Sequence, residues 1–171
     1  MPLLEMVGFT CTGNTFSIGF AFISNEDVAS YRWVLTQLKG VYDELGVQVN
    51  TIMTDREQAL IKAISQVFGD GVQHLLCWVH IRHKIIAYGL KVFANAEKPH
   101  ELSRGFANAC WALFSSTTEA TFEERYVELK RRWRPTLIAY VEKVWLNPFK
   151  KNIVRAWTDH TLHFQTRTTN R

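Results

Sequence analysis

The stretch that decides the fold runs from Val47 to His80 and reads VQVNTIMTDREQALIKAISQVFGDGVQHLLCWVH. One apolar run ends at Thr54 and is followed at once by Asp55, and a second ends at Cys77. Between them, apolar pairs recur one helical turn apart, which predicts an amphipathic helix. An acid between a buried strand and a helix is a frequent ligand position, because open α/β sheets bind ligands outside the carboxyl ends of their strands.

Composition bounds the class of protein. The 171 residues are 47% hydrophobic and include six tryptophans, so the chain can bury one sizeable core, or one domain with a small appendage. It has no apolar run of about 18 or more residues, so we expect no membrane span. The start, MPLLE, lacks a basic region and a cleavage site and predicts no secretory signal. Three widely spaced cysteines indicate an intracellular, reduced protein.

Positive charge is concentrated in the C-terminal third. Residues 122–171 carry 11 lysines and arginines against 5 acids, whereas residues 1–121 carry 9 against 11. A polyanion such as nucleic acid would be attracted to this third, although the solvated face of a helix would have a similar composition.

The hydrophobic pattern predicts a hairpin, a helix, a strand, a helix and a strand, followed by an all-helical tail. Ser24 is the expected cap of the first helix and Gly46 its stop. The expected strands are 2–11, 15–23, 47–54 and 73–77, and the helices after the first are 56–68, 78–93, 99–115, 117–133 and 136–146. Residues 157–171 are Thr-rich and polar and indicate a loop.

Asp55 has two interpretations. It can be a Mg²⁺-binding carboxylate for phosphoryl transfer, because Mg²⁺ takes oxygen ligands from one or two carboxylates together with substrate phosphate. Two-metal chemistry places the ions roughly 3.5–4 Å apart and so needs several carboxylates from separate strands. Alternatively, Asp55 is the N-cap of the following helix and satisfies free backbone N–H groups.

Cys77 and His80 form a Cys-x-x-His pair. The pair can be half of a zinc site or a polar pair that faces a cleft, but a structural zinc needs four ligands and no second pair completes a zinc finger. A buried cysteine at a strand end with a histidine on the next helix is the favoured interpretation, and zinc is not expected.

Basic residues cluster around an aromatic residue near the C-terminus. They suit contacts with DNA phosphates and equally suit the solvated face of a helix. The candidate contacts are Arg131, Arg132, Arg134, Lys150 and Lys151. The tryptophans at 111, 133, 145 and 157 are expected in the core of the helical part.

Several segments together resemble one family. They are FAFISNE (20–26), TDREQAL (54–60), HLLCWVHI (74–81) and FQTRTTNR (164–171). The combination closely resembles the Mutator-like (MULE) transposase domain. The similarity covers essentially the whole chain, being strong over residues 1–90 and weak through the helices.

The resemblance implies an α/β, ribonuclease-H-like mixed sheet with a C-terminal all-helical insertion. Residues 1–83 would form a partial core, 84–156 the insertion, and 157–171 a loop leading toward the last catalytic element. Relatives of this kind cut and join transposon ends with Mg²⁺ or Mn²⁺. Asp55 matches the second acid of the family's triad, and Cys77 and His80 match its Cys-x-x-His pair. DNA is the implied partner, a homo-oligomer is left open, and the implied location is nuclear.

Two of the three family acids lie outside this sequence. The first belongs to a central strand expected before Met1, and the last is a Glu expected after Arg171. Without the central strand, the hairpin and the strand that ends at Thr54 would each present an unpaired edge. We therefore expect the chain to be inactive as written. The alternatives are a domesticated nuclear DNA-binding regulator of the far-red-impaired-response type, and a degenerate remnant without function.

Overall fold

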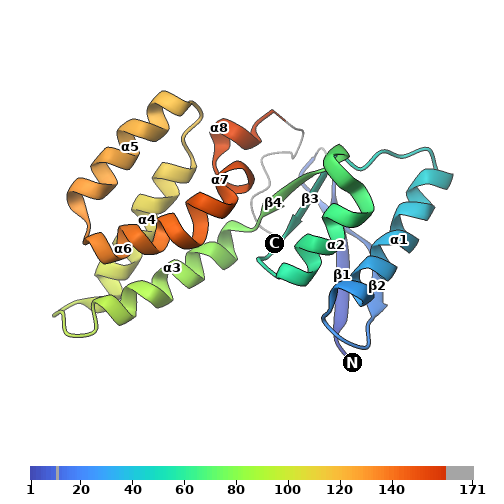
Figure 1. Cartoon of the computed structure of the whole chain (residues 1–171), viewed down its shortest axis with the longest axis horizontal. Coiled ribbons are helices and arrows are strands. Elements are labelled where there is room, and N and C mark those ends of the chain that lie inside the picture. Colours follow the sequence, from blue (N-terminus) through green and yellow to red (C-terminus); the bar gives the residue numbers. More distant parts are fainter. Residues whose placement is uncertain (11, 161–171) are drawn as a thin grey trace. The chain divides into compact units, whose positions relative to one another are not determined.

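The computed structural model describes residues 1–10 and 12–160, which divide into two compact units. The α/β unit comprises Met1–His74 and the helical unit Leu75–His160 (Figure 1). The chain is thus mixed α/β, with small sheets and mostly helices. The finer division at residues 83 and 156 stays a prediction, and its last segment lies largely outside the described residues.

The chain begins with the predicted hairpin. Strand β1 (Leu3–Phe9) pairs antiparallel with β2 (Thr15–Phe22), with a register shift between Met6 and Val7. Gly13 has a φ of 80°, which other residues adopt only with strain, and this lets the connection turn tightly. The hairpin expected from the apolar runs at 2–11 and 15–23 is therefore confirmed.

The two faces of the hairpin have different surroundings. Leu4, Met6 and Ala21 pack against the core of the α/β unit. The opposite face carries large apolar side chains that are exposed, namely Leu3, Phe16, Ile18, Phe20 and Phe22. The alternation follows from the two-residue period of a strand, so one face is covered and the other is not.

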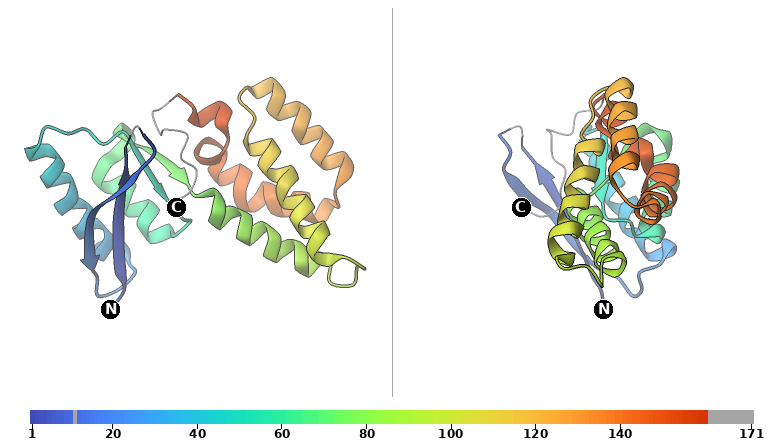
Figure 2. Two further views of the ribbon diagram at one scale, coloured as in Figure 1. Left: turned by 180° about the vertical axis from the view of Figure 1, so that it is seen from behind. Right: turned by 90° about the vertical axis from the view of Figure 1, so that its left-hand side faces the viewer.

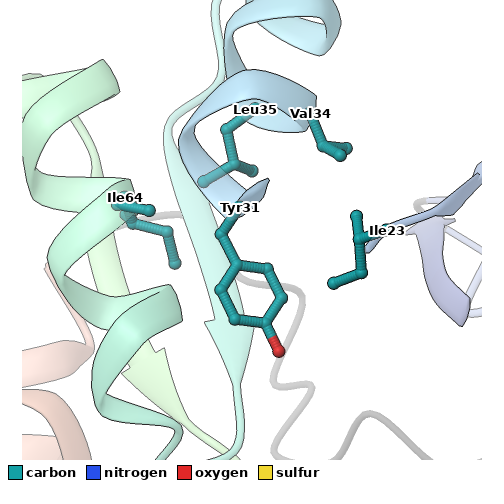
Figure 3. Close-up of a cluster of buried hydrophobic side chains, with 6 residues drawn as sticks. Ile23, Tyr31, Val34, Leu35 and Ile64 are labelled. Atoms are coloured by element: carbon teal, nitrogen blue, oxygen red, sulfur yellow. The ribbon is translucent and has the colours of Figure 1, made fainter. Parts of the chain in front are cut away.

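Helices α1 (Val28–Glu44) and α2 (Gln58–Phe68) supply most of this core. Figure 3 shows Tyr31 and Leu35 of α1 facing Ile64 of α2, with Ile23 beside them. Each fully buried aliphatic side chain of this kind contributes about 1.5–3 kcal/mol. The cap of α1 is Asp27, whose side chain accepts the Ser30 N–H at 2.8 Å, so the prediction of Ser24 was wrong.

The second sheet consists of β3 (Thr51–Thr54) and β4 (Gln73–Leu76). Strand β3 starts later than the predicted Val47. The reason is that the Val47 N–H bonds back to the Tyr42 carbonyl at 2.9 Å and so completes the end of α1. Among the described residues no strand joins β1–β2 to β3–β4, yet Ile52 of β3 packs against the same core as the hairpin.

The helical unit follows β4 (Figure 2). Its elements are α3 (Trp78–Val92), α4 (Pro99–Phe114), α5 (Glu119–Arg132), α6 (Pro135–Val141), the π-helix η2 (Glu142–Leu146), α7 (Asn147–Ile153) and α8 (Arg155–Thr158). The first four confirm predicted helices. Helix α7 was not predicted, and α8 corrects the expected loop at Trp157 and Thr158. None of the described helices is long and apolar enough to cross a membrane.

The core of the helical unit is apolar and tightly packed. Its fully buried large side chains are Ile85, Phe106, Leu113, Phe114, Leu137, Val141 and Trp145. Trp145 confirms the core prediction, whereas Trp111, Trp133 and Trp157 are half-buried. Helices α3 and α4 approach closely at Gly89, where a Cβ would lie 3.0 Å from the Ser103 hydroxyl.

Candidate functional site

Asp55 lies at the carboxyl end of β3, exposed, three residues before α2 begins. Its Oδ1 accepts the backbone N–H of Glu57 at 3.1 Å. The N-cap of α2 is Glu57, whose own carboxylate accepts the Ala59 N–H at 3.1 Å. The capping interpretation of Asp55 is therefore corrected. Its second oxygen has no hydrogen bond to another described residue, so it can take an external ligand.

Next to Asp55 in the chain, Thr54 forms a part-buried hydrogen-bonded pair with His74. The Oγ1 of Thr54 lies 2.8 Å from Nε2 of His74 on β4, and it donates to the Asp55 carbonyl at 2.6 Å. Burial lowers the pKa of His74 to about 4, so the imidazole is neutral at physiological pH. Sequence reasoning missed both residues. The available signal was a polar residue on each of two neighbouring short strands.

Three carboxylates of the α/β unit, those of Glu26, Glu57 and Asp55, act on Tyr31. Burial raises the pKa of Tyr31, and the carboxylates of Glu26, Glu57 and Asp55 raise it further, in that order of effect. Such influence requires these acids to lie near the Tyr31 hydroxyl. Even so, no three His, Cys, Asp or Glu side chains within the described ranges are arranged to hold a metal ion. Asp55 therefore offers one carboxylate of the several that two-metal chemistry needs.

Cys77 and His80 lie at the start of α3. Cys77 is the N-cap residue and is fully buried, and His80 follows one turn along. The Nδ1 of His80 is buried without a hydrogen-bond partner among the described residues. This placement agrees with the favoured interpretation of a buried cysteine beside a helical histidine. The expectation that no zinc binds there stays a prediction.

The predicted DNA contacts all belong to the helical unit, but they form two clusters. Lys150 lies 3.9 Å from Glu123 and above the rings of Phe122 and Trp157, near the start of α5. Arg131, Arg132 and Arg134 lie around its other end. The two clusters lie about nine helical residues apart along α5. At a rise of roughly 1.5 Å per residue, this is a separation of about 14 Å.

Several of these cations already have partners inside the protein. Arg131 makes two 2.9 Å hydrogen bonds to Glu128. Arg134 donates to the Val92 carbonyl at 3.1 Å and lies over the ring of Phe93. Lys151 is exposed and has no ion pair with a described residue. Lys151 is therefore a better candidate for a phosphate contact than Arg131, because the charge of Arg131 is already engaged by Glu128.

Comparison with known proteins gives two findings. Residues 1–84 match the model of the MULE transposase domain family, which confirms the resemblance for this part of the chain. A segment of 82 residues, 47% of the chain, is 33% identical to the PKS-NRPS hybrid synthetase cheA of Chaetomium globosum. The match spans only 2% of that synthetase.

Proposed function

Because residues 1–84 match the MULE transposase domain, we propose that the chain is part of a transposase catalytic core that cuts and joins DNA. The observation that carries the proposal is the position of Asp55. It follows a strand of the matched segment, is exposed, and has a carboxylate oxygen available. The match to the synthetase covers too little of that protein to bring its chemistry to this chain.

The proposed fold of the complete core is ribonuclease-H-like. This proposal is supported by two observations: the two sheets are separate, and strands of both pack against one core. Leu4 and Met6 of β1 and Ile52 of β3 all pack against the buried cluster of α1 and α2. A central strand between β1 and β3 would join the two pairs into one sheet and satisfy the backbone groups of both edges.

The role proposed for Asp55 is to hold Mg²⁺ or Mn²⁺. Its free oxygen is a hard, charged ligand of the kind that Mg²⁺ prefers, so the residue fits the ion. When bound, such an ion stabilises the attacking and leaving oxygens of a phosphodiester. The chain itself orients the carboxylate through the Glu57 N–H, and the basic residues of the helical unit would approach DNA phosphates. A nuclear location follows from this role.

The experiment is a cleavage assay with terminal-repeat and nicked DNA duplexes in the presence of Mg²⁺ or Mn²⁺. We expect this chain alone to leave both substrates intact, since one carboxylate cannot hold two ions. We expect the complete transposase core to cleave them, and its Asp55→Ala variant to lose cleavage. Cleavage by the chain alone that disappears in Asp55→Ala would contradict the proposed inactivity. Full cleavage by Asp55→Ala in the complete core would contradict the role of Asp55.

A regulator of the far-red-impaired-response type is the second candidate. It is favoured because no three His, Cys, Asp or Glu side chains among the described residues are arranged to hold a metal ion, and DNA binding without cutting needs no such cluster. Two results together would support this candidate over the transposase. The complete protein would bind duplex DNA with an affinity that EDTA does not change, and it would not cleave that DNA.

A further inference from the structure

We propose that Thr54 of β3 and His74 of β4 are positioning residues that hold Asp55 in place. The proposal rests on the proposed function, since it is the metal-binding role of Asp55 that makes its position matter. It assigns a role to two residues that lie in the quoted segments TDREQAL and HLLCWVHI but to which the sequence analysis gave none.

The Thr54 hydroxyl contacts two partners. The Thr54 hydroxyl has one hydrogen, and it is donated to the Asp55 carbonyl at 2.6 Å. The same oxygen accepts from His74 across the 2.8 Å contact in the tautomer that carries the imidazole hydrogen on Nε2. Thr54 is buried and His74 is half-buried, which limits the access of water to these bonds.

Thr54 and His74 hold the backbone of Asp55, whereas the Glu57 N–H holds its side chain. The Thr54 hydroxyl fixes the carbonyl of Asp55, and the Glu57 N–H fixes Oδ1 at 3.1 Å. His74 lies 20 residues away in sequence, so it ties this local turn to a second strand. Without that tie, the peptide after Asp55 can rotate, and the Glu57 bond to the carboxylate is lost for part of the time.

A purely structural role makes a different prediction. A buried threonine and histidine that only satisfy each other would, when removed, destabilise the α/β unit as a whole. All protected amides of the unit would then exchange faster together. A positioning role instead raises exchange at Glu57 and leaves the amides of Leu35 and Ile64 in the core unchanged.

The experiment is hydrogen exchange of the ¹⁵N-labelled chain followed by NMR, without metal. Thr54→Val keeps the side-chain shape and removes the hydroxyl, whereas Thr54→Ser keeps the hydroxyl. His74→Leu removes the donor, whereas His74→Gln retains an N–H near Nε2. We expect Glu57 to exchange up to about tenfold faster in Thr54→Val and His74→Leu, as for the loss of one hydrogen bond. Thr54→Ser and His74→Gln should restore the slow rate.

The control is His83→Leu, which changes an exposed histidine of α3 and should leave Glu57 as in the wild type. Unchanged exchange of Glu57 in Thr54→Val, or an equal rise at Leu35 and Ile64, would overturn the proposal. Thr54→Val decides the question if His74→Leu does not fold. Because no metal is present, failure here is distinct from a failure of Asp55 to bind metal, which is measured separately.

Discussion

At the residue scale, the candidate site depends on how Asp55 is held at the end of β3. One oxygen is used by the Glu57 N–H and the carbonyl by Thr54, so the residue is fixed on two sides while its second oxygen stays available. The nearby acids Glu26 and Glu57 add negative potential around Tyr31. A cation would be attracted to this side of the α/β unit.

His74 gives the α/β unit a specific pH dependence. Its pKa is lowered by burial from 6.5 to about 4, so the folded state binds this proton less readily than the unfolded state. The stability is fully present above about pH 6.5 and is lost as the pH falls through 4. Between pH 7 and 4 we expect the wild type to lose up to about 3 kcal/mol more than His74→Gln. Urea unfolding of both proteins at several pH values measures this, and equal losses would contradict it.

The sequence identified Asp55 but not the residues that support it. An acid after an apolar run is a local pattern, visible in a few consecutive residues. The contact between Thr54 and His74 joins residues 20 positions apart and depends on how β3 pairs with β4, which composition and spacing do not determine. The same limit hid the partner of Lys150, which comes from Glu123 on a different helix. Glu128 lies three residues before Arg131 on one helix, so that pair follows a local spacing that the sequence analysis did not use.

At the element scale, most strands and helices were predictable because their signals are local. The hairpin has its turn residues and α1 its apolar stripe, and both confirm the prediction. Helix α7 was not predicted, and it contains Pro148. Proline is tolerated in the first turn of a helix, which is where Pro148 lies. Residues 161–171, including the predicted family motif at 164–171, lie outside the described residues.

Two helical glycines should respond oppositely to the same substitution. Gly40 of α1 is exposed with nothing within 4 Å of an added Cβ, so Gly40→Ala should stabilise the protein by about 0.5–1 kcal/mol. In Gly89→Ala the new Cβ would lie 3.2 Å from the Ser103 backbone, and the Ser103 hydroxyl is held by the Pro99 carbonyl. We expect a loss of about 1 kcal/mol. Urea denaturation compares them, and stabilisation by Gly89→Ala would show that α3 and α4 are packed less tightly than described.

The two basic clusters should contribute unequally to DNA binding. Lys151 is exposed without an ion pair to a described residue, whereas Arg131 is engaged by Glu128. We expect Lys151→Ala to weaken binding to a DNA duplex and to reduce the slope of log affinity against log salt by about 1. Arg131→Ala should have a smaller effect.

Fluorescence anisotropy at several salt concentrations measures both variants, with Lys39→Ala in the α/β unit as the control. Lys39 is paired with Asp43 at 2.6 Å and lies outside both clusters. An equal loss of affinity in all three variants would contradict a specific contribution of the helical unit.

At the scale of the whole molecule, the chain consists of an α/β unit and a helical unit, each with its own core. The α/β unit holds two strand pairs on one shared core and exposes a row of phenylalanines on the other face of the hairpin. The described strands form two separate sheets, and a central strand between them stays a prediction. The local pattern of apolar runs predicted the strands, whereas the packing within the helical unit could not be predicted from it.

Titration of the ¹⁵N-labelled chain with Mn²⁺ tests the central claim most directly, because this paramagnetic ion broadens only the resonances near it. We predict that residues around Asp55 broaden first and that Asp55→Asn, which keeps the shape and removes the charge, abolishes the effect. Asp70→Asn, which changes another exposed acid of the same unit, should leave it intact. Broadening around Asp55 that persists in Asp55→Asn, or that is centred on other residues, would contradict the role of Asp55 as the metal-binding carboxylate.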